Sequence, residues 1–175
     1  MDILVSSNLE RLLYLSCGRD AAKTKELMEQ LSKNGKYEIT PEMKEFMKDF
    51  SAGYADMEEN AKEIKKVFDD TGYLIDTHTG VAAAVYEQYK KKTGDMTKTV
   101  IASTASPYKF SRSVMEAVLG KKEDADEFAL IDEMERISGV KIPQAIEEIR
   151  DAKILHNRQC KPEEMEETVK QTFSK

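Results

Sequence analysis

Two short segments of the chain are apolar without alternating polar positions. They are DILV at residues 2–5 and TVIA at residues 99–102. Uninterrupted apolar runs are typical of strands that are covered on both faces in a parallel sheet. Because such strands satisfy their backbone groups by sharing a sheet, we expect these two to be adjacent and parallel. Parallel sheets usually hold about five or six strands, so two strands predict only a remnant of a larger sheet.

The rest of the pattern is mainly amphipathic, with apolar residues at helical spacing. A first helix starts near Ser7 and runs through residue 15, and residues 73–75 are expected to be extended. Further helices are predicted over residues 21–32, 42–50, 58–70, 78–93, 107–119, 124–138, 143–151 and 162–173. The expected fold class is α/β and predominantly helical, with a small parallel sheet flanked by helices.

Polar residues and glycines mark the ends of several predicted helices. Ser7 and Glu10 have the spacing of a capping box, and Asp76 can cap the helix that follows it. Gly94 closes that helix, as glycines often do at helix C-termini. A Ser-Pro pair at residues 106–107 predicts another helix start.

Composition narrows the class of protein. The 175 residues are 40% hydrophobic and 34% charged with a net charge of −6, which indicates a soluble, helix-rich protein and disfavours nucleic-acid binding. Cys17 and Cys160 have neither CxxC spacing nor a nearby histidine partner, so we expect no disulfide and no metal site. With no apolar run of about 18 residues and no export signal, we expect a cytoplasmic protein with no membrane partner.

A hydroxyl-rich segment follows the second apolar run. Ser103 and Thr104 would lie at the carboxyl end of a parallel strand, where open α/β sheets bind ligands. The next helix would present free N–H groups that favour anions. Alternatively, Ser106 only caps that helix while Ser103 and Thr104 bind local backbone groups. Spacing alone leaves both alternatives open.

A second candidate site lies near the N-terminus. The turn formed by Ser6, Ser7, Asn8 and Arg11 combines backbone N–H groups, hydroxyl groups and one guanidinium, which suits a phosphate. The alternative is that this turn is only a helix cap. His78 can face a substrate, or it can simply be tolerated in the first turn of its helix.

Four segments resemble the carboxy-terminal portion of bacterial threonine synthases. They are MDILVSSNLERLLY at 1–14, FSAGYADMEE at 50–59, GYLIDTHTGVAAAVY at 72–86 and TVIASTASPYKF at 99–110. The likeness covers about the first 120 residues and is weaker after Gly120. Many family members have DPHTAVG where this chain has DTHTGVA at 76–82, and STAHP where it has STASP at 103–107.

The resemblance implies a fold-type II pyridoxal-phosphate (PLP) enzyme of amino-acid biosynthesis. Such enzymes convert O-phosphohomoserine and water into threonine and phosphate, and they are carbon–oxygen lyases acting on phosphates. Their Schiff-base lysine and glycine-rich phosphate loop lie upstream of the segments seen here. We therefore expect a carboxy-terminal fragment that is inactive and does not bind PLP specifically on its own, and whose partner is the missing amino-terminal part.

The resemblance also suggests roles for particular residues. In this structural type the pyridine nitrogen commonly meets a Ser or Thr hydroxyl after a late strand, so Thr104, and second Ser103, are candidates for cofactor binding. A purely structural role for Thr104 is the alternative. The candidates for substrate binding are Asn8, Ser7, Arg11 and His78. No catalytic residue is assigned within this chain.

The expected organisation has two parts. Residues 1–120 would be the carboxy-terminal part of the PLP-binding domain, including a helical segment at 19–72, and residues 121–175 a helical extension. An unprotected sheet edge predicts self-association. The rival interpretation is a helical interaction module without catalytic activity. A glycine-rich loop and a lysine motif encoded upstream of Met1 would favour the enzyme.

Overall fold

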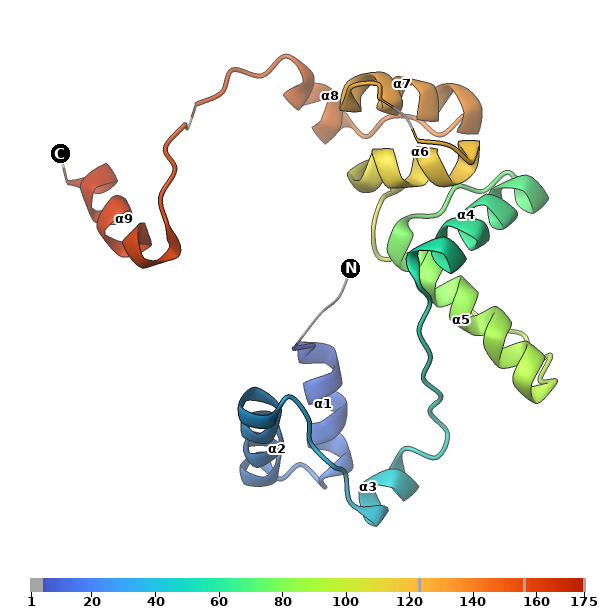
Figure 1. Cartoon of the computed structure of the whole chain (residues 1–175), viewed down its shortest axis with the longest axis vertical. Coiled ribbons are helices and arrows are strands. Elements are labelled where there is room, and N and C mark those ends of the chain that lie inside the picture. The colour runs from blue at the N-terminus through green and yellow to red at the C-terminus, as the bar shows by residue number, and fades with distance from the viewer. Residues whose placement is uncertain (1–4, 123, 156, 175) are drawn as a thin grey trace.

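The fold is known from a computed structural model, which describes residues 5–122, 124–155 and 157–174. Helices dominate this part of the chain (Figure 1). They are α1 (Ser7–Ser16), α2 (Ala21–Asn34), α3 (Pro41–Phe46), α4 (Met57–Thr71), α5 (Thr77–Thr93), α6 (Ser111–Leu119), α7 (Glu127–Ser138), α8 (Gln144–Arg150) and α9 (Met165–Phe173), with short 3₁₀ helices η1 (Pro107–Phe110) and η2 (Pro162–Glu164).

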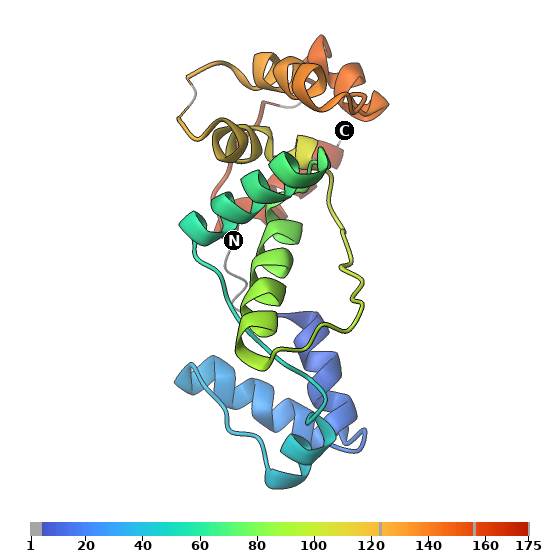
Figure 2. The same ribbon diagram turned by 90° about the vertical axis from the view of Figure 1, so that its right-hand side faces the viewer.

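Helices α1, α2 and α3 form a small group with an apolar centre of its own. Leu13, Leu27 and Met43, one from each helix, are buried against one another. Asp20 caps α2 by accepting hydrogen bonds from two backbone N–H groups, and Gly35 ends that helix in the left-handed conformation. The three helices lie together in both views of the molecule (Figures 1 and 2).

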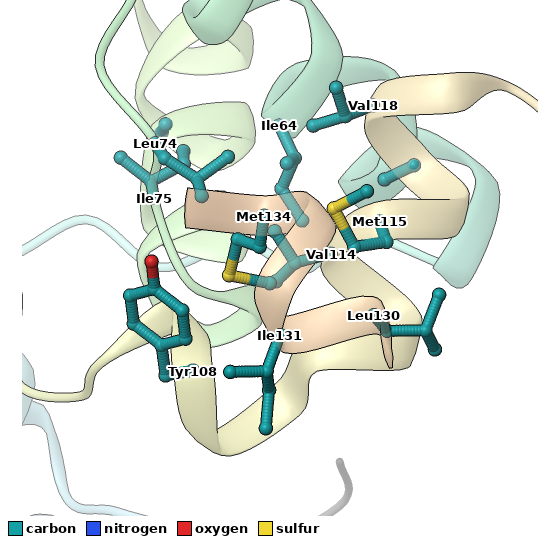
Figure 3. Close-up of a cluster of buried hydrophobic side chains, with 12 residues drawn as sticks. Ile64, Leu74, Ile75, Tyr108, Val114, Met115, Val118, Leu130, Ile131 and Met134 are labelled. Atoms are coloured by element: carbon teal, nitrogen blue, oxygen red, sulfur yellow. The ribbon is translucent and has the colours of Figure 1, made fainter. Parts of the chain in front are cut away.

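The main hydrophobic core lies among α4, α5, α6 and α7. Ile64, Val114, Met115 and Met134 are almost completely buried there, and their side chains converge in Figure 3. Tyr108 of η1 adds its ring to the core and donates its hydroxyl hydrogen to the carbonyl of Val140. This core joins residues from both sides of position 120, so α6 and α7 are held as one packed unit.

Long, largely exposed connections join the outer helices to this core. Residues 47–56 lead from α3 to α4, and the exposed residues 151–155 and 157–161 lead from α8 towards α9. In Figures 1 and 2, the chain between α5 and α6 returns along α5 from its C-terminal end to its N-terminal end. Its last residues therefore lie beside the start of α5.

The expected sheet remnant is not found in the described residues, which form no strand. The TVIA segment is instead an irregular, largely exposed connection in which Val100 is 92% exposed. A strand needs a neighbour for its backbone groups, and β-branched residues alone do not supply one. Residues 2–4 of the DILV segment lie outside the described residues. The predicted parallel pairing of DILV with TVIA therefore stays a prediction. The predominantly helical character is confirmed.

Most predicted helices are present, with some corrected boundaries. Asp76 caps α5 and Gly94 ends it, as predicted. The first helix is capped by Ser6 and not by Ser7, because the Ser6 side chain accepts the hydrogen bond from Leu9 N–H. Helix α3 ends at Phe46, short of the predicted residue 50; Phe50 is 60% exposed, so extending the helix to it would bury little apolar surface. None of the described helices is long and apolar enough to cross a membrane.

Candidate functional site

The start of α5 holds a buried carboxylate. Leu74 and Ile75 insert into the core just before it (Figure 3), and this draws Asp76 inside until its exposed fraction is 0%. Asp76 Oδ1 accepts hydrogen bonds from the backbone N–H groups of His78 at 2.8 Å and Thr79 at 3.4 Å. The carboxylate thus satisfies free N–H groups at the positive end of the helix dipole.

The electrostatics of Asp76 favour its ionised form. Burial alone raises the pKa of the carboxyl group, but hydrogen bonds from the Thr79 hydroxyl and from the His78 backbone and ring outweigh burial. The pKa of Asp76 therefore lies below its ordinary value. An ionised carboxylate accepts hydrogen bonds and donates none.

The Thr79 hydroxyl connects Asp76 to the loop before η1. Thr79 is buried, and its hydroxyl donates a short hydrogen bond to Asp76 Oδ2. The same oxygen lies 2.9 Å from Ser103 Oγ, on the segment that returns along α5. Ser103 is thereby joined to the buried carboxylate through one intervening hydroxyl, although 24 residues separate it from Thr79.

His78 is held at the same carboxylate. Its Nδ1 lies 3.1 Å from Asp76 Oδ1, and its ring packs against Phe110 with centroids 4.9 Å apart and planes tilted by 51°. Because an ionised carboxylate only accepts, Nδ1 carries the hydrogen of this bond. The other ring nitrogen is left for a further partner, and the His78 side chain is 33% exposed.

Two anchors hold the loop that carries Ser103 and Thr104. Before it, Ile101 packs against the main core, and after it Tyr108 is buried. Between these anchors Ser103 and Thr104 are both exposed. Ser106 accepts a hydrogen bond from Tyr108 N–H at 3.3 Å, which confirms its predicted capping role.

The other candidate residues lie on α1. Arg11 Nη1 donates to Asn8 Oδ1 at 3.0 Å, and both residues are exposed. Ser7 and Arg11 line a cleft of about 670 Å³ between α1 and α2 that also contains Glu29. The structure thus brings Ser103 and His78 to one carboxylate, whereas Ser7, Asn8 and Arg11 belong to the separate α1–α3 group (Figure 1).

Sequence reasoning missed Thr79 and Phe110, and it treated Asp76 only as a cap. The signal for Thr79 was a threonine three residues after a capping aspartate, which places its hydroxyl beside the capping carboxylate. Its link to Ser103 left no local signal. In the described part of the chain no three His, Cys, Asp or Glu side chains gather as a metal would require, and Cys17 and Cys160 are free.

Comparison with known proteins shows which protein family this chain resembles. Residues 79–154, which begin at the residue that bonds to Asp76 and end after α8, match the family described as threonine synthase, C-terminal. The chain is therefore threonine synthase-like, and it corresponds to the carboxy-terminal part of such proteins.

Individual relatives show the same similarity. The threonine synthase of Saccharomyces cerevisiae is 32% identical over 174 residues, covering 90% of this chain and 34% of that protein. The Schizosaccharomyces pombe enzyme is 36% identical over 126 residues, covering 65% of this chain and 24% of that protein. A crystal structure of PLP-bound threonine synthase from Brucella melitensis matches with a TM-score of 0.58 and 31% identity over 81% of this chain and 29% of that one. The chain thus spans about a third or less of these relatives.

Proposed function

We propose that the chain is the carboxy-terminal part of a PLP-dependent threonine synthase. The whole protein would convert O-phosphohomoserine and water into threonine and phosphate, as a carbon–oxygen lyase acting on phosphates. The observation that carries the proposal is the similarity to the yeast enzyme, which runs over 90% of this chain. The proposal includes a cytoplasmic location, which fractionation of source cells tests.

The Asp76 cluster, comprising Asp76, His78, Thr79 and Ser103, fits one part of the cofactor. It contains no lysine or arginine, which a phosphate calls for, and the hydroxyl of the adjoining Thr104 is the group that can donate to the ring nitrogen of PLP. When bound, PLP supplies the electron sink for the elimination chemistry. Thr104, and second Ser103, would contact the ring nitrogen. A hydroxyl partner does not hold that nitrogen protonated as a carboxylate would.

The substrate phosphate calls for cationic and amide groups. We assign this role to Asn8, Ser7 and Arg11, because a guanidinium and a helix start both favour anions. His78 would face the substrate with its remaining ring nitrogen. The covalently binding lysine and the phosphate loop would come from the amino-terminal part of the protein, which is the proposed partner of this chain.

A chimera tests the proposed function. The matching carboxy-terminal segment of the yeast threonine synthase is replaced by this chain, and phosphate release from O-phosphohomoserine is measured with PLP present. We expect turnover by the chimera and none by the yeast amino-terminal part alone. A chimera that is folded but neither binds PLP nor releases phosphate contradicts the proposal and favours the helical interaction module.

The chain alone provides a second test. It is incubated with PLP, reduced with borohydride and digested, and the labelled peptides are mapped. Because catalysis depends on a positioned lysine and a fixed cofactor, we expect scattered weak labelling and no phosphate release. One stoichiometrically labelled lysine together with turnover would overturn this expectation.

A further inference from the structure

We infer that Thr79 is a positioning residue that fixes the direction of the Ser103 hydroxyl, so that Ser103 offers a ligand only acceptor lone pairs and Thr104 is the hydroxyl left to donate. The part that concerns PLP rests on the proposed function. The part that concerns Thr79 and Ser103 rests on the contacts of this chain alone.

The first step concerns the hydrogens around Asp76. Its Oδ1 already receives the N–H groups of His78 and Thr79 and the ring Nδ1 of His78. Its Oδ2 receives the hydroxyl of Thr79. The ionised carboxylate of Asp76 carries no hydrogen, so Thr79 is the donor in the short hydrogen bond between them.

The second step follows from the single hydrogen of a hydroxyl group. Because Thr79 gives its hydrogen to Asp76, it can only accept in its other bond. The 2.9 Å contact between Thr79 Oγ1 and Ser103 Oγ is therefore a hydrogen bond that Ser103 donates. A chain of two bonds results, running from Ser103 through Thr79 to the buried carboxylate.

The third step concerns what remains for a ligand. With its hydrogen committed, Ser103 can receive an N–H or O–H group but cannot donate to an unprotonated ring nitrogen. Thr104, the next residue, is exposed on the same loop. If the ring nitrogen of PLP is unprotonated, its partner is Thr104, while Ser103 holds the loop against α5.

The chain itself tests the positioning role without cofactor. Hα–Hβ couplings of Ser103 are measured by NMR in the wild type, Thr79→Val, Thr79→Ser and Thr93→Val. Thr93 is the matched control, because its hydroxyl binds the Tyr89 carbonyl near the other end of α5. We expect one Ser103 rotamer in the wild type and in Thr93→Val, averaging in Thr79→Val, and recovery in Thr79→Ser. Unchanged couplings in Thr79→Val would overturn the inference.

Ser103→Ala guards against misfolding of Thr79→Val, since it removes the other end of the bond at an exposed position. Backbone order parameters of residues 102–105 are compared with those of the wild type. We expect them to fall in Ser103→Ala while those of α5 stay unchanged. Order parameters that stay at the wild-type values across the loop would contradict the positioning role.

The chimera then tests the direction of donation. We expect Thr104→Val to weaken PLP binding about tenfold or more, because it removes one hydrogen-bond donor to a buried partner. Ser103→Ala should weaken PLP binding clearly less. A weaker effect of Thr104→Val than of Ser103→Ala would overturn the assignment. If no chimera binds PLP, the proposed function fails and the assignment of Thr104 fails with it, whereas the NMR comparison still decides the role of Thr79.

Discussion

Asp76 combines complete burial with the largest concentration of hydrogen bonds in the candidate site. Its replacement by alanine leaves the N–H groups of His78 and Thr79 and the Thr79 hydroxyl without their acceptor. We expect Asp76→Ala to lower the free energy of unfolding by about 2–3 kcal/mol, measured by urea denaturation followed by circular dichroism. Asp126→Ala is the control, because Asp126 caps α7 in the same way but is exposed, and it should cost about 1 kcal/mol. Equal losses of unfolding free energy in Asp76→Ala and Asp126→Ala would show that the burial of Asp76 adds nothing to its capping role.

The lowered pKa of Asp76 predicts a dependence of stability on pH. Since the folded chain holds this carboxyl group below its ordinary pKa of 3.8, the stabilisation is complete above that value and is lost as pH falls through the folded pKa. The difference in unfolding free energy between the wild type and Asp76→Asn should therefore be constant from neutral pH to about pH 4 and shrink below it. Glu133→Gln removes a carboxylate whose partner Arg136 is exposed, so we expect a small difference there. If the difference in unfolding free energy between the wild type and Asp76→Asn increased below pH 4, the prediction would be wrong.

Among elements, α4 and α5 make a contact that only glycine allows. A Cβ atom at Gly80 would lie 2.2 Å from Asn60 Oδ1 and 2.8 Å from Ile64 Cγ1. We expect Gly80→Ala to destabilise the chain by about 1–3 kcal/mol through overpacking, although alanine is the better helix former. Thermal unfolding monitored by circular dichroism measures the effect.

Ala82→Gly on the exposed side of α5 is the control for Gly80→Ala. It should cost about 1 kcal/mol by helix propensity alone. A Gly80→Ala variant as stable as the wild type would show that α4 and α5 can separate without loss.

Local signals account for the elements that the sequence predicted well. Asp76 and Gly94 act within a turn of the helix that they bound, so their roles follow from neighbouring residues. The TVIA segment was misassigned because an apolar, β-branched run does not indicate whether a second strand lies beside it. The bond from Ser103 to Thr79 depends on the path of the chain between Gly94 and Ser106, which no periodicity encodes. His78 and Ser103 were thus predicted as separate candidates, and their shared carboxylate was not.

At the scale of the whole molecule, apolar side chains remain exposed around α5. Tyr54 is 83%, Met57 90% and Val100 92% exposed, and a groove of about 1020 Å³ runs between α5 and the segment that contains Val100. The prediction of self-association, which the sequence based on an open sheet edge, is based instead on this exposed apolar surface. We expect sedimentation to show concentration-dependent association that Val100→Asp weakens. Val169→Asp on the distant α9 is the control, and a single monomer at all concentrations would contradict the prediction.

The exposed connection between α8 and α9 has a consequence for proteolysis. Lys153 and Arg158 lie on it outside any helix, where a protease can draw the backbone into its active site. We expect a trypsin time course followed by mass spectrometry to show cleavage there first and at Lys48 in the connection before α4 next. Early cleavage at Lys65 within α4 would contradict this order. In a protease-rich extract the molecule would therefore lose its last helix well before it loses the helices that hold Asp76 and Ser103 together.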